Sequence, residues 1–270
     1  MFQPLIDKGF QIEFHSHAEA ILSVDFPDAS TQLEAAMKDM TIPIEEIVGS
    51  GGGETKGTQR LRRALAASGW HKVNFTIEKR INGQPRESQS HEVDHVRTFD
   101  KGVVALEIEW NNKDPFFDRD LENFKRLHAE GGISLGVIVT RGMSLQADMV
   151  ALVKRFAEEK GFTSNDDLAG IGLNPTLRQK TNVIRRMQRE IGFPQAWAEA
   201  FVADKFGQAT THWRKLEDRV HRGVGNPCPL VLIGLPSSIV TFGEPASVVE
   251  ELLEEGADAA EAEKEEGESS

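Results

Sequence analysis

The spacing of apolar residues predicts a chain in which helices and strands alternate. In several segments apolar residues recur three and four positions apart, the period of a helix that packs one face against a core. These segments are 30–40, which ends before Pro43; 58–65, which we expect Thr58 to cap; 116–130, which ends at Gly131-Gly132; 144–160; and 181–191. We therefore expect these helices to cover a shared core.

Extended runs lie between the predicted helices. Alternating apolar residues from Val73 to Ile81 lead into Asn82-Gly83, the preferred two-residue hairpin turn, and a second run reaches Val96. Three more runs follow, VVALEIEW at 103–110, ISLGVIVTR at 133–141 and LVLIGLP at 230–236. The run at 133–141 is almost continuously apolar, as in a strand that is buried on both faces and parallel to the strand before it. The predicted fold is α/β, with a mixed β-sheet flanked by helices.

The composition is that of a globular intracellular protein. Its 270 residues are 39% hydrophobic and 27% charged, which excludes a collagen-like chain and a mostly disordered one. The single cysteine, Cys228, excludes a disulfide framework and a zinc site built from cysteines, and it fits a reducing compartment. The start of the chain has no signal-peptide pattern, and nowhere do 18 apolar residues run together. We expect a cytoplasmic protein that does not enter a membrane.

The net charge of −12 is distributed unevenly along the chain. Residues 244–270 hold 11 acidic residues and one lysine, whereas residues 1–243 hold 32 acidic and 30 basic residues. A strongly acidic protein is a poor partner for nucleic acid, but the body of this chain is nearly neutral. No repeat or linker divides that body. We therefore expect a single domain over 1–243 and an acidic, disordered tail over 244–270, with a short helix around 248–253.

The strongest chemical signal is the pair of glutamates Glu107 and Glu109. Residues two apart in a strand project from the same face, so both carboxylates share one site while Leu106 and Ile108 point to the other face. Like charges this close favour a raised pKa or a bound cation, and Mg²⁺ is the natural hard cation for oxygen ligands. Asp94, on the preceding strand, can supply a third carboxylate from across the sheet. The alternative is a strand that faces water and pairs with lysines.

Three motifs occur together around these carboxylates: HEVD at 91–94, LEIEWNNKDPFFDRDL at 106–121 and GVIVTRG at 136–142. They resemble type II restriction endonucleases of the BglII/BamHI-like group, and the resemblance runs from about residue 10 to residue 236. It implies the PD-(D/E)XK nuclease core, with Asp94 and Glu107 holding Mg²⁺. The third position of the motif is usually lysine, but here it is Glu109, as in the BamHI-like members. This departure leaves the identity of the general base open.

Two polar segments are candidates for DNA contact. Asn111, Asn112 and Lys113 follow the carboxylate strand at the end of a parallel strand, where α/β proteins place their sites. Asparagine amides can read adenine and a lysine can meet a phosphate. The second segment combines hydroxyls with cations, and its candidates are Thr210, Thr211, His212 and Lys215. The alternatives are a turn with local hydrogen bonds for the first segment and a solvated amphipathic helix for the second.

The glycine loop at 51–53 precedes Glu54, a candidate accessory acidic residue near the metal. The same loop has some likeness to a phosphate-binding loop, but Lys56 follows Thr55 and not a glycine. The required Gly-Lys-Ser/Thr order is therefore absent, which excludes nucleotide binding there.

The sequence thus predicts a Mg²⁺-dependent, sequence-specific endonuclease that cuts double-stranded DNA. From the resemblance we expect a prokaryotic homodimer acting on a short palindromic site and leaving 5′-phosphates. Three alternatives stay open: a repair or junction nuclease on the same core, a non-catalytic DNA-binding module, and an acidic partner-binding protein.

Overall fold

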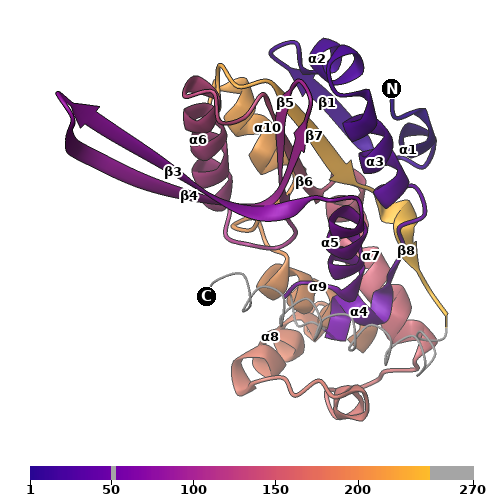
Figure 1. Cartoon of the computed structure of the whole chain (residues 1–270). Helices are drawn as coiled ribbons and strands as arrows, with labels where there is room; N and C mark the ends of the chain where they lie inside the picture. Colours follow the sequence, from indigo (N-terminus) through magenta and orange to yellow (C-terminus); the bar gives the residue numbers. More distant parts are fainter. Residues whose placement is uncertain (50–52, 244–270) are drawn as a thin grey trace.

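The computed structural model describes residues 1–49 and 53–243 (Figure 1). Its centre is a six-stranded mixed sheet in the order β1-β7-β6-β5-β4-β3. The strands are β1 (Gln11–His15), β3 (His71–Ile81), β4 (Gln84–Phe99), β5 (Gly102–Glu109), β6 (Leu135–Arg141) and β7 (Leu230–Leu235). Two short strands, β2 (Ile42–Pro43) and β8 (Val240–Thr241), pair separately. The mixed α/β fold expected from the sequence is confirmed.

The pairing of the strands follows from their connections. Helix α6 (Phe116–Ala129) links β5 to β6 as a crossover, and β5, β6 and β7 are parallel. The chain segments β3, β4 and β5 form an antiparallel meander, and β1 is antiparallel to β7. Strands β6 and β7 are buried along their whole length, in agreement with their continuous apolar runs.

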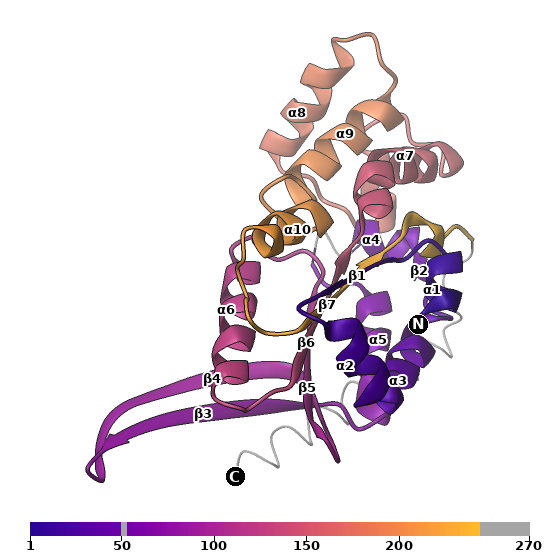
Figure 2. The ribbon, with the colours of Figure 1, turned by 90° about the horizontal axis from the view of Figure 1, so that it is seen from above.

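Helices cover both faces of the sheet (Figure 2). On one face α6 and α10 (Trp213–His221) pack against side chains such as Ala105, Ile138 and Leu232. On the other face Leu106 and Val137 belong to the larger core. The helices that contribute to this core are α1 (Gln3–Asp7), α2 (Ala18–Val24), α3 (Pro27–Met37), α4 (Ile44–Gly49), α5 (Lys56–Ala67), α7 (Met143–Glu159), α8 (Leu177–Met187) and α9 (Phe193–Lys205).

Strands β3 and β4 form a long hairpin that projects from the body (Figures 1 and 2). At its tip Asn82 and Gly83 both have positive φ, 51° and 77°, as the predicted two-residue turn requires. Side chains of Val73, Phe75 and Ile77 at the base of the hairpin pack beside the core under α6. The core contacts that these three side chains make therefore lie at the base of the hairpin.

Two local expectations were wrong, and a long helix was missed. Helix α5 is capped by Thr55, whose hydroxyl accepts a hydrogen bond from the backbone N of Thr58 (3.2 Å), so Thr58 lies inside the helix. The helix expected at 181–191 begins earlier and ends at Met187, because Thr176 and Gln179 form a capping box upstream. Helix α9 was not predicted at all. It packs against both α7 and α8, so its buried residues do not form a single stripe.

Some expectations fall on residues outside the described ranges. These include Gly51 and the acidic tail at 244–270 with its short helix, so the domain boundary at 243 stays a prediction. In the two ranges that are described, no helix is long and apolar enough to cross a membrane.

Candidate active site

Glu107 and Glu109 lie on β5, on the sheet face that α6 covers. Strand alternation places both on the side of Ala105, which packs in one cluster with Phe117 of α6. Only 5% of the surface of Glu107 and 2% of that of Glu109 is exposed. The alternative of two glutamates on a water-facing strand is therefore excluded.

Asp94 lies beside Glu107 on the neighbouring strand. The pairing of β4 with β5 ends at His95 opposite Leu106, so the next position of β4 is adjacent to Glu107. The pairing of β3 with β4 shifts by one residue at the same place, which is a β-bulge, a feature that re-aims side chains near active sites. The Asp94 side chain is half exposed, and its Oδ1 lies 3.8 Å from Nζ of Lys72. The three predicted catalytic carboxylates are thus on adjacent positions of two strands.

Asp94 also lines a cleft with a volume of about 300 Å³. Glu54, the predicted accessory residue, lines the same cleft and its carboxylate lies 3.4 Å from Arg62 of α5. Asn111 and Asn112 are also among the residues that line it. The segment before α5 and the loop after β5 therefore meet at this cleft.

A third buried carboxylate, Asp120 of α6, adds to the charge of the site. Burial, then Asp120 and Asp94, raise the pKa of Glu107 to about 9, and burial followed by Asp120 raises the pKa of Glu109 to about 8. Burial also raises the pKa of Asp120. Arg119 lies 2.8 Å from Asp120 and 3.5 Å from Glu109. Arg119 and Lys72 are two cations beside four carboxyl groups, so ionisation of all four would leave an excess of negative charge, which a divalent cation would balance.

The donor chemistry fits a hard cation, although the side chains are held in other contacts. Among the described residues no three acidic, histidine or cysteine side chains are grouped so that they could hold a metal. Asp94 pairs with Lys72, and Oε2 of Glu109 accepts a hydrogen bond from Nδ2 of Asn112 (2.8 Å). Oδ2 of Asp120 is buried with no hydrogen-bond partner in the described structure. Metal binding by Asp94 would therefore require this carboxylate to exchange Lys72 for the ion.

The raised pKa values predict a stability that falls as the pH rises in the absence of metal. In the folded protein Glu107 keeps a proton up to a pKa of about 9, whereas its ordinary pKa is 4.5. Between these values the folded state binds more protons than the unfolded chain, so rising pH favours unfolding. Calorimetry in EDTA from about pH 5 to pH 9 should show a falling Tm, and Mg²⁺ added at about pH 8 should raise it. A Tm that is constant or rises through this window in EDTA would contradict the assignment.

The two segments predicted to contact DNA lie side by side. The backbone N of Asn112 donates to Oγ1 of Thr211 (3.0 Å), and the backbone N of Thr211 donates to the carbonyl of Asn112 (2.8 Å). Lys113 and Thr210 form an isolated β-bridge. We call these segments, 110–114 and 207–212, the paired loops. They bring residues far apart in sequence to the carboxyl end of β5.

The paired loops expose only part of the predicted contact set. Asn112 and Lys113 are exposed, whereas Thr211 and His212 are buried, with 0% and 2% of their surfaces accessible. Burial, with the nearby Arg141, lowers the pKa of His212 to about 4 and keeps it neutral. The other predicted residues are held within the chain, in the pairs Asn111–Lys205, Thr210–Arg141 and Lys215–Asp114. Asn112 and Lys113 are therefore the members of the set that are exposed to solvent, while the others hold the loops in place.

Three residues of this site were not predicted from the sequence: Arg119, Asp120 and Arg141. Asp120 follows Phe117 by three positions and precedes Phe124 by four, so its place on the buried face of α6 was readable from helical spacing. Arg141 is the last residue of an apolar run that is buried on both faces. A charged residue in such a run could also have been recognised from the sequence as a buried residue. Arg119 is half exposed on α6 and gave no such signal.

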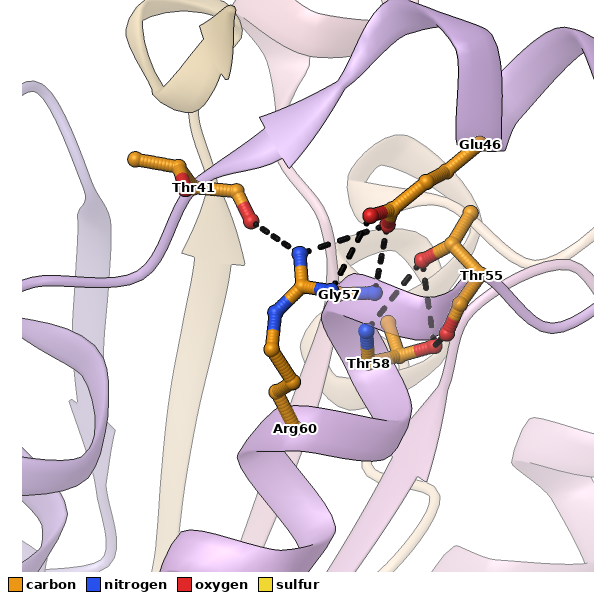
Figure 3. A network of polar contacts seen from close by, with 6 residues as sticks. All are labelled: Thr41, Glu46, Thr55, Gly57, Thr58 and Arg60. Atoms are coloured by element: carbon orange, nitrogen blue, oxygen red, sulfur yellow. Dashed lines mark hydrogen bonds and ion pairs between the residues drawn. The ribbon is translucent and has the colours of Figure 1, made fainter. Parts of the chain in front are cut away.

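The N-terminus of α5 borders the cleft and is closed by the chain's own carboxylate (Figure 3). Glu46 of α4 accepts a hydrogen bond from the backbone N of Gly57 (2.7 Å) and lies 3.0 Å from Arg60. A Cβ at position 57 would lie 2.7 Å from Cγ1 of Ile42, so glycine permits the close approach of α5 to β2. The helix end that could bind a phosphate is therefore occupied, which agrees with the exclusion of a nucleotide-binding loop.

Comparison with known proteins identifies the family. No curated protein matches the chain. A family model described as restriction endonuclease BglII/BglIII matches residues 10–235, a range that includes the β4 and β5 carboxylates, α6 and both paired loops. The resemblance carried by the motifs at 91–94, 106–121 and 136–142 is thereby confirmed. The chain belongs to the BglII/BglIII family of restriction endonucleases.

Proposed function

We propose that the protein is a Mg²⁺-dependent type II restriction endonuclease that hydrolyses double-stranded DNA at a short palindromic site. The observation that carries this proposal is the buried pair Glu107 and Glu109 beside Asp94, in a chain of a restriction endonuclease family. Carboxylates held away from water and in excess over cations suit a divalent ion and a reaction on a phosphodiester. A palindromic site implies a homodimer with twofold symmetry, acting in the cytoplasm of a prokaryote.

The carboxylates divide into ligands and a base. We assign Asp94 and Glu107 as ligands of Mg²⁺, with Glu54 as an accessory acidic residue on the same cleft. When bound, Mg²⁺ would neutralise charge on the scissile phosphate. Glu109, ionised beside the cation, takes a proton from the attacking water. The water oxygen forms a bond to phosphorus as the P–O3′ bond breaks, and the leaving 3′-oxygen takes a proton from solvent, which gives a 3′-hydroxyl and a 5′-phosphate.

The paired loops supply the DNA contacts in this proposal. Asn112 meets a base edge and Lys113 meets a phosphate, since both are exposed at the carboxyl end of β5. The remaining members of the set support these two by holding the loops in place; they are Asn111, Thr210, Thr211, His212 and Lys215.

Incubation of the purified protein with phage DNA and Mg²⁺, with EDTA as the control, tests the function directly. Discrete Mg²⁺-dependent fragments whose sequenced ends share one palindrome and carry 5′-phosphates are expected. A smear of fragments would instead indicate a repair or junction nuclease. Intact DNA that is bound but never cut, from a source without protective methylation, would indicate a non-catalytic module.

Lys113→Gln should weaken DNA binding by the same factor for every sequence. If Lys113 neutralises one phosphate, the slope of log K against log salt concentration should fall in magnitude by about 0.9. The measurement is a salt titration of the dissociation constant for duplexes with and without the site. Lys101→Gln is the matched control, because Lys101 pairs with Asp25 at the opposite end of β5. An unchanged slope would remove Lys113 from the phosphate contacts.

A further inference from the structure

Arg141 is the last residue of β6 and is fully buried, with 0% of its surface exposed. Its guanidinium donates four hydrogen bonds. Nε donates to the carbonyl of Trp110 (2.8 Å) and Nη1 to Oε1 of Gln146 (2.6 Å). Nη2 donates both to Oγ1 of Thr210 and to the carbonyl of Thr211, each at 2.7 Å. All three nitrogens of the planar fork are therefore used.

The acceptors of Arg141 belong to segments that are distant in sequence. Trp110 directly follows the strand that carries Glu107 and Glu109, and it begins the first of the paired loops. The two threonines belong to the second loop. Gln146 lies on α7, and its Nε2 donates to the carbonyl of Phe206 (2.9 Å), just after α9. A single side chain thus connects the end of the carboxylate strand to both paired loops and to the helices behind them.

Burying the charge of Arg141 in this way costs free energy that a merely structural contact does not require. The four acceptors are neutral oxygens, and in the ranges described no carboxylate forms an ion pair with Arg141. The ring of Phe206 lies 5.0 Å from the guanidinium carbon. Burial lowers the pKa of Arg141 to about 9, which reflects the cost of enclosing its charge. An apolar side chain would fill a strand end at lower cost, so the arginine is best explained by the geometry that it imposes.

We propose that Arg141 is a positioning residue that couples DNA reading to DNA cleavage. By holding Trp110 against Thr210 and Thr211, it sets the place of Asn112 and Lys113 relative to Glu107 and Glu109. A contact between the loops and a DNA base is thereby held at a fixed position relative to the two carboxylates. The inference rests on the proposed function, because it concerns the same site.

The test compares Arg141→Lys and Arg141→Ala with the unmodified protein. Single-turnover cleavage rates are measured on a duplex carrying the mapped site and on duplexes with one base pair altered, together with the DNA dissociation constant in EDTA. An ammonium cannot satisfy acceptors in three segments at once, so both variants should lose rate, by about 10²-fold for Arg141→Ala. The ratio of correct to altered-site cleavage should fall roughly 10-fold. Millimolar guanidinium should restore part of the rate of Arg141→Ala.

A matched core variant separates positioning from general destabilisation. Val153→Ala removes methyl groups from a fully buried side chain of α7 that lies further along this helix than Gln146. It should lower Tm without changing the cleavage ratio. If Val153→Ala shifts the ratio as much as Arg141→Lys, or if Arg141→Lys keeps the normal rate and ratio, the inference is overturned. Should Arg141→Ala fail to fold, Arg141→Lys carries the test alone. If the unmodified protein cuts no DNA at all, the failure lies with the proposed function and not with Arg141.

Discussion

Glu107→Gln should abolish DNA cleavage and at the same time stabilise the metal-free protein. The amide has nearly the shape of the carboxyl group but cannot serve as an anionic ligand, so cleavage should fall by about 10³-fold or more. The stability should change in the opposite direction. At about pH 8 the folded protein keeps Glu107 protonated, since burial and the neighbouring Asp120 and Asp94 hold its pKa near 9. The amide needs no proton, so in EDTA its Tm should exceed that of the unmodified protein by about 2 °C or more.

The experiment measures cleavage of site-containing DNA and the Tm on the same samples. Glu78→Gln is the matched control, because Glu78 is exposed on the hairpin and pairs with Arg80 at 3.0 Å. This control should alter neither quantity. Normal cutting by Glu107→Gln would remove Glu107 from the active site. Loss of cleavage together with a lowered Tm would mean that Glu107 has a structural role and that its burial does not destabilise the folded protein.

The carboxylate positions could be predicted from sequence because they depend on local geometry. The two-residue period of a strand places Glu107 and Glu109 on one face, and the short turn between β4 and β5 places Asp94 near Glu107. Their burial could not be predicted, because it depends on how α6 packs over that face. The partner Lys72 on β3 also depends on the bulge beside Asp94, and no turn or spacing signal indicates that bulge in advance.

The paired loops show the same division. The pattern of polar residues identified both loops, and for the first of them, at 110–114, the position at the end of a parallel strand was predictable from the crossover connection. Their pairing was not, because it is made by hydrogen bonds between segments nearly a hundred residues apart. That pairing buries Thr211 and His212 and leaves Asn112 exposed. A residue type with suitable chemistry is therefore not enough to indicate contact, since burial decides which side chains reach a ligand.

The fold was predictable where a periodic pattern was long. The meander, the crossover at α6 and the buried strand β6 all have such patterns, and the structure contains each of them. The N-terminal elements α1, β1 and α2 span 5, 5 and 7 residues and are too short to show a period. Helix α9 is long, but neighbours on two sides bury it without a single stripe. A periodic pattern thus predicts long elements that bury one face. It misses elements that are too short to show a period and helices that are buried on more than one side.

Gly136→Ala should destabilise the protein, because β6 and α6 are in contact at this position. A Cβ on Gly136 would lie 2.4 Å from Cδ2 and 2.9 Å from Cε2 of Phe124. Phe124 is fully buried, so its ring cannot move into solvent. Overpacking of this kind typically costs about 1–3 kcal/mol. Because α6 also carries Arg119 and Asp120, displacement of the helix should slow DNA cleavage as well.

A second substitution tests whether the contact with Phe124 is the cause. Phe124→Leu alone should destabilise the protein by leaving a cavity, but combined with Gly136→Ala it removes the clash. Denaturant unfolding is measured for the unmodified protein, the two single variants and the double variant. The free energy of unfolding of the double variant should exceed the value predicted from the sum of the two single effects by about 1 kcal/mol. Gly170→Ala is the control, since a Cβ there meets nothing within 4 Å. Additive effects, or a Gly136→Ala variant as stable as the unmodified protein, would show that α6 does not bear on β6 at this point. The close approach of α6 would then no longer explain the burial of Glu107 and Glu109, which depends on that helix lying directly over their face of the sheet.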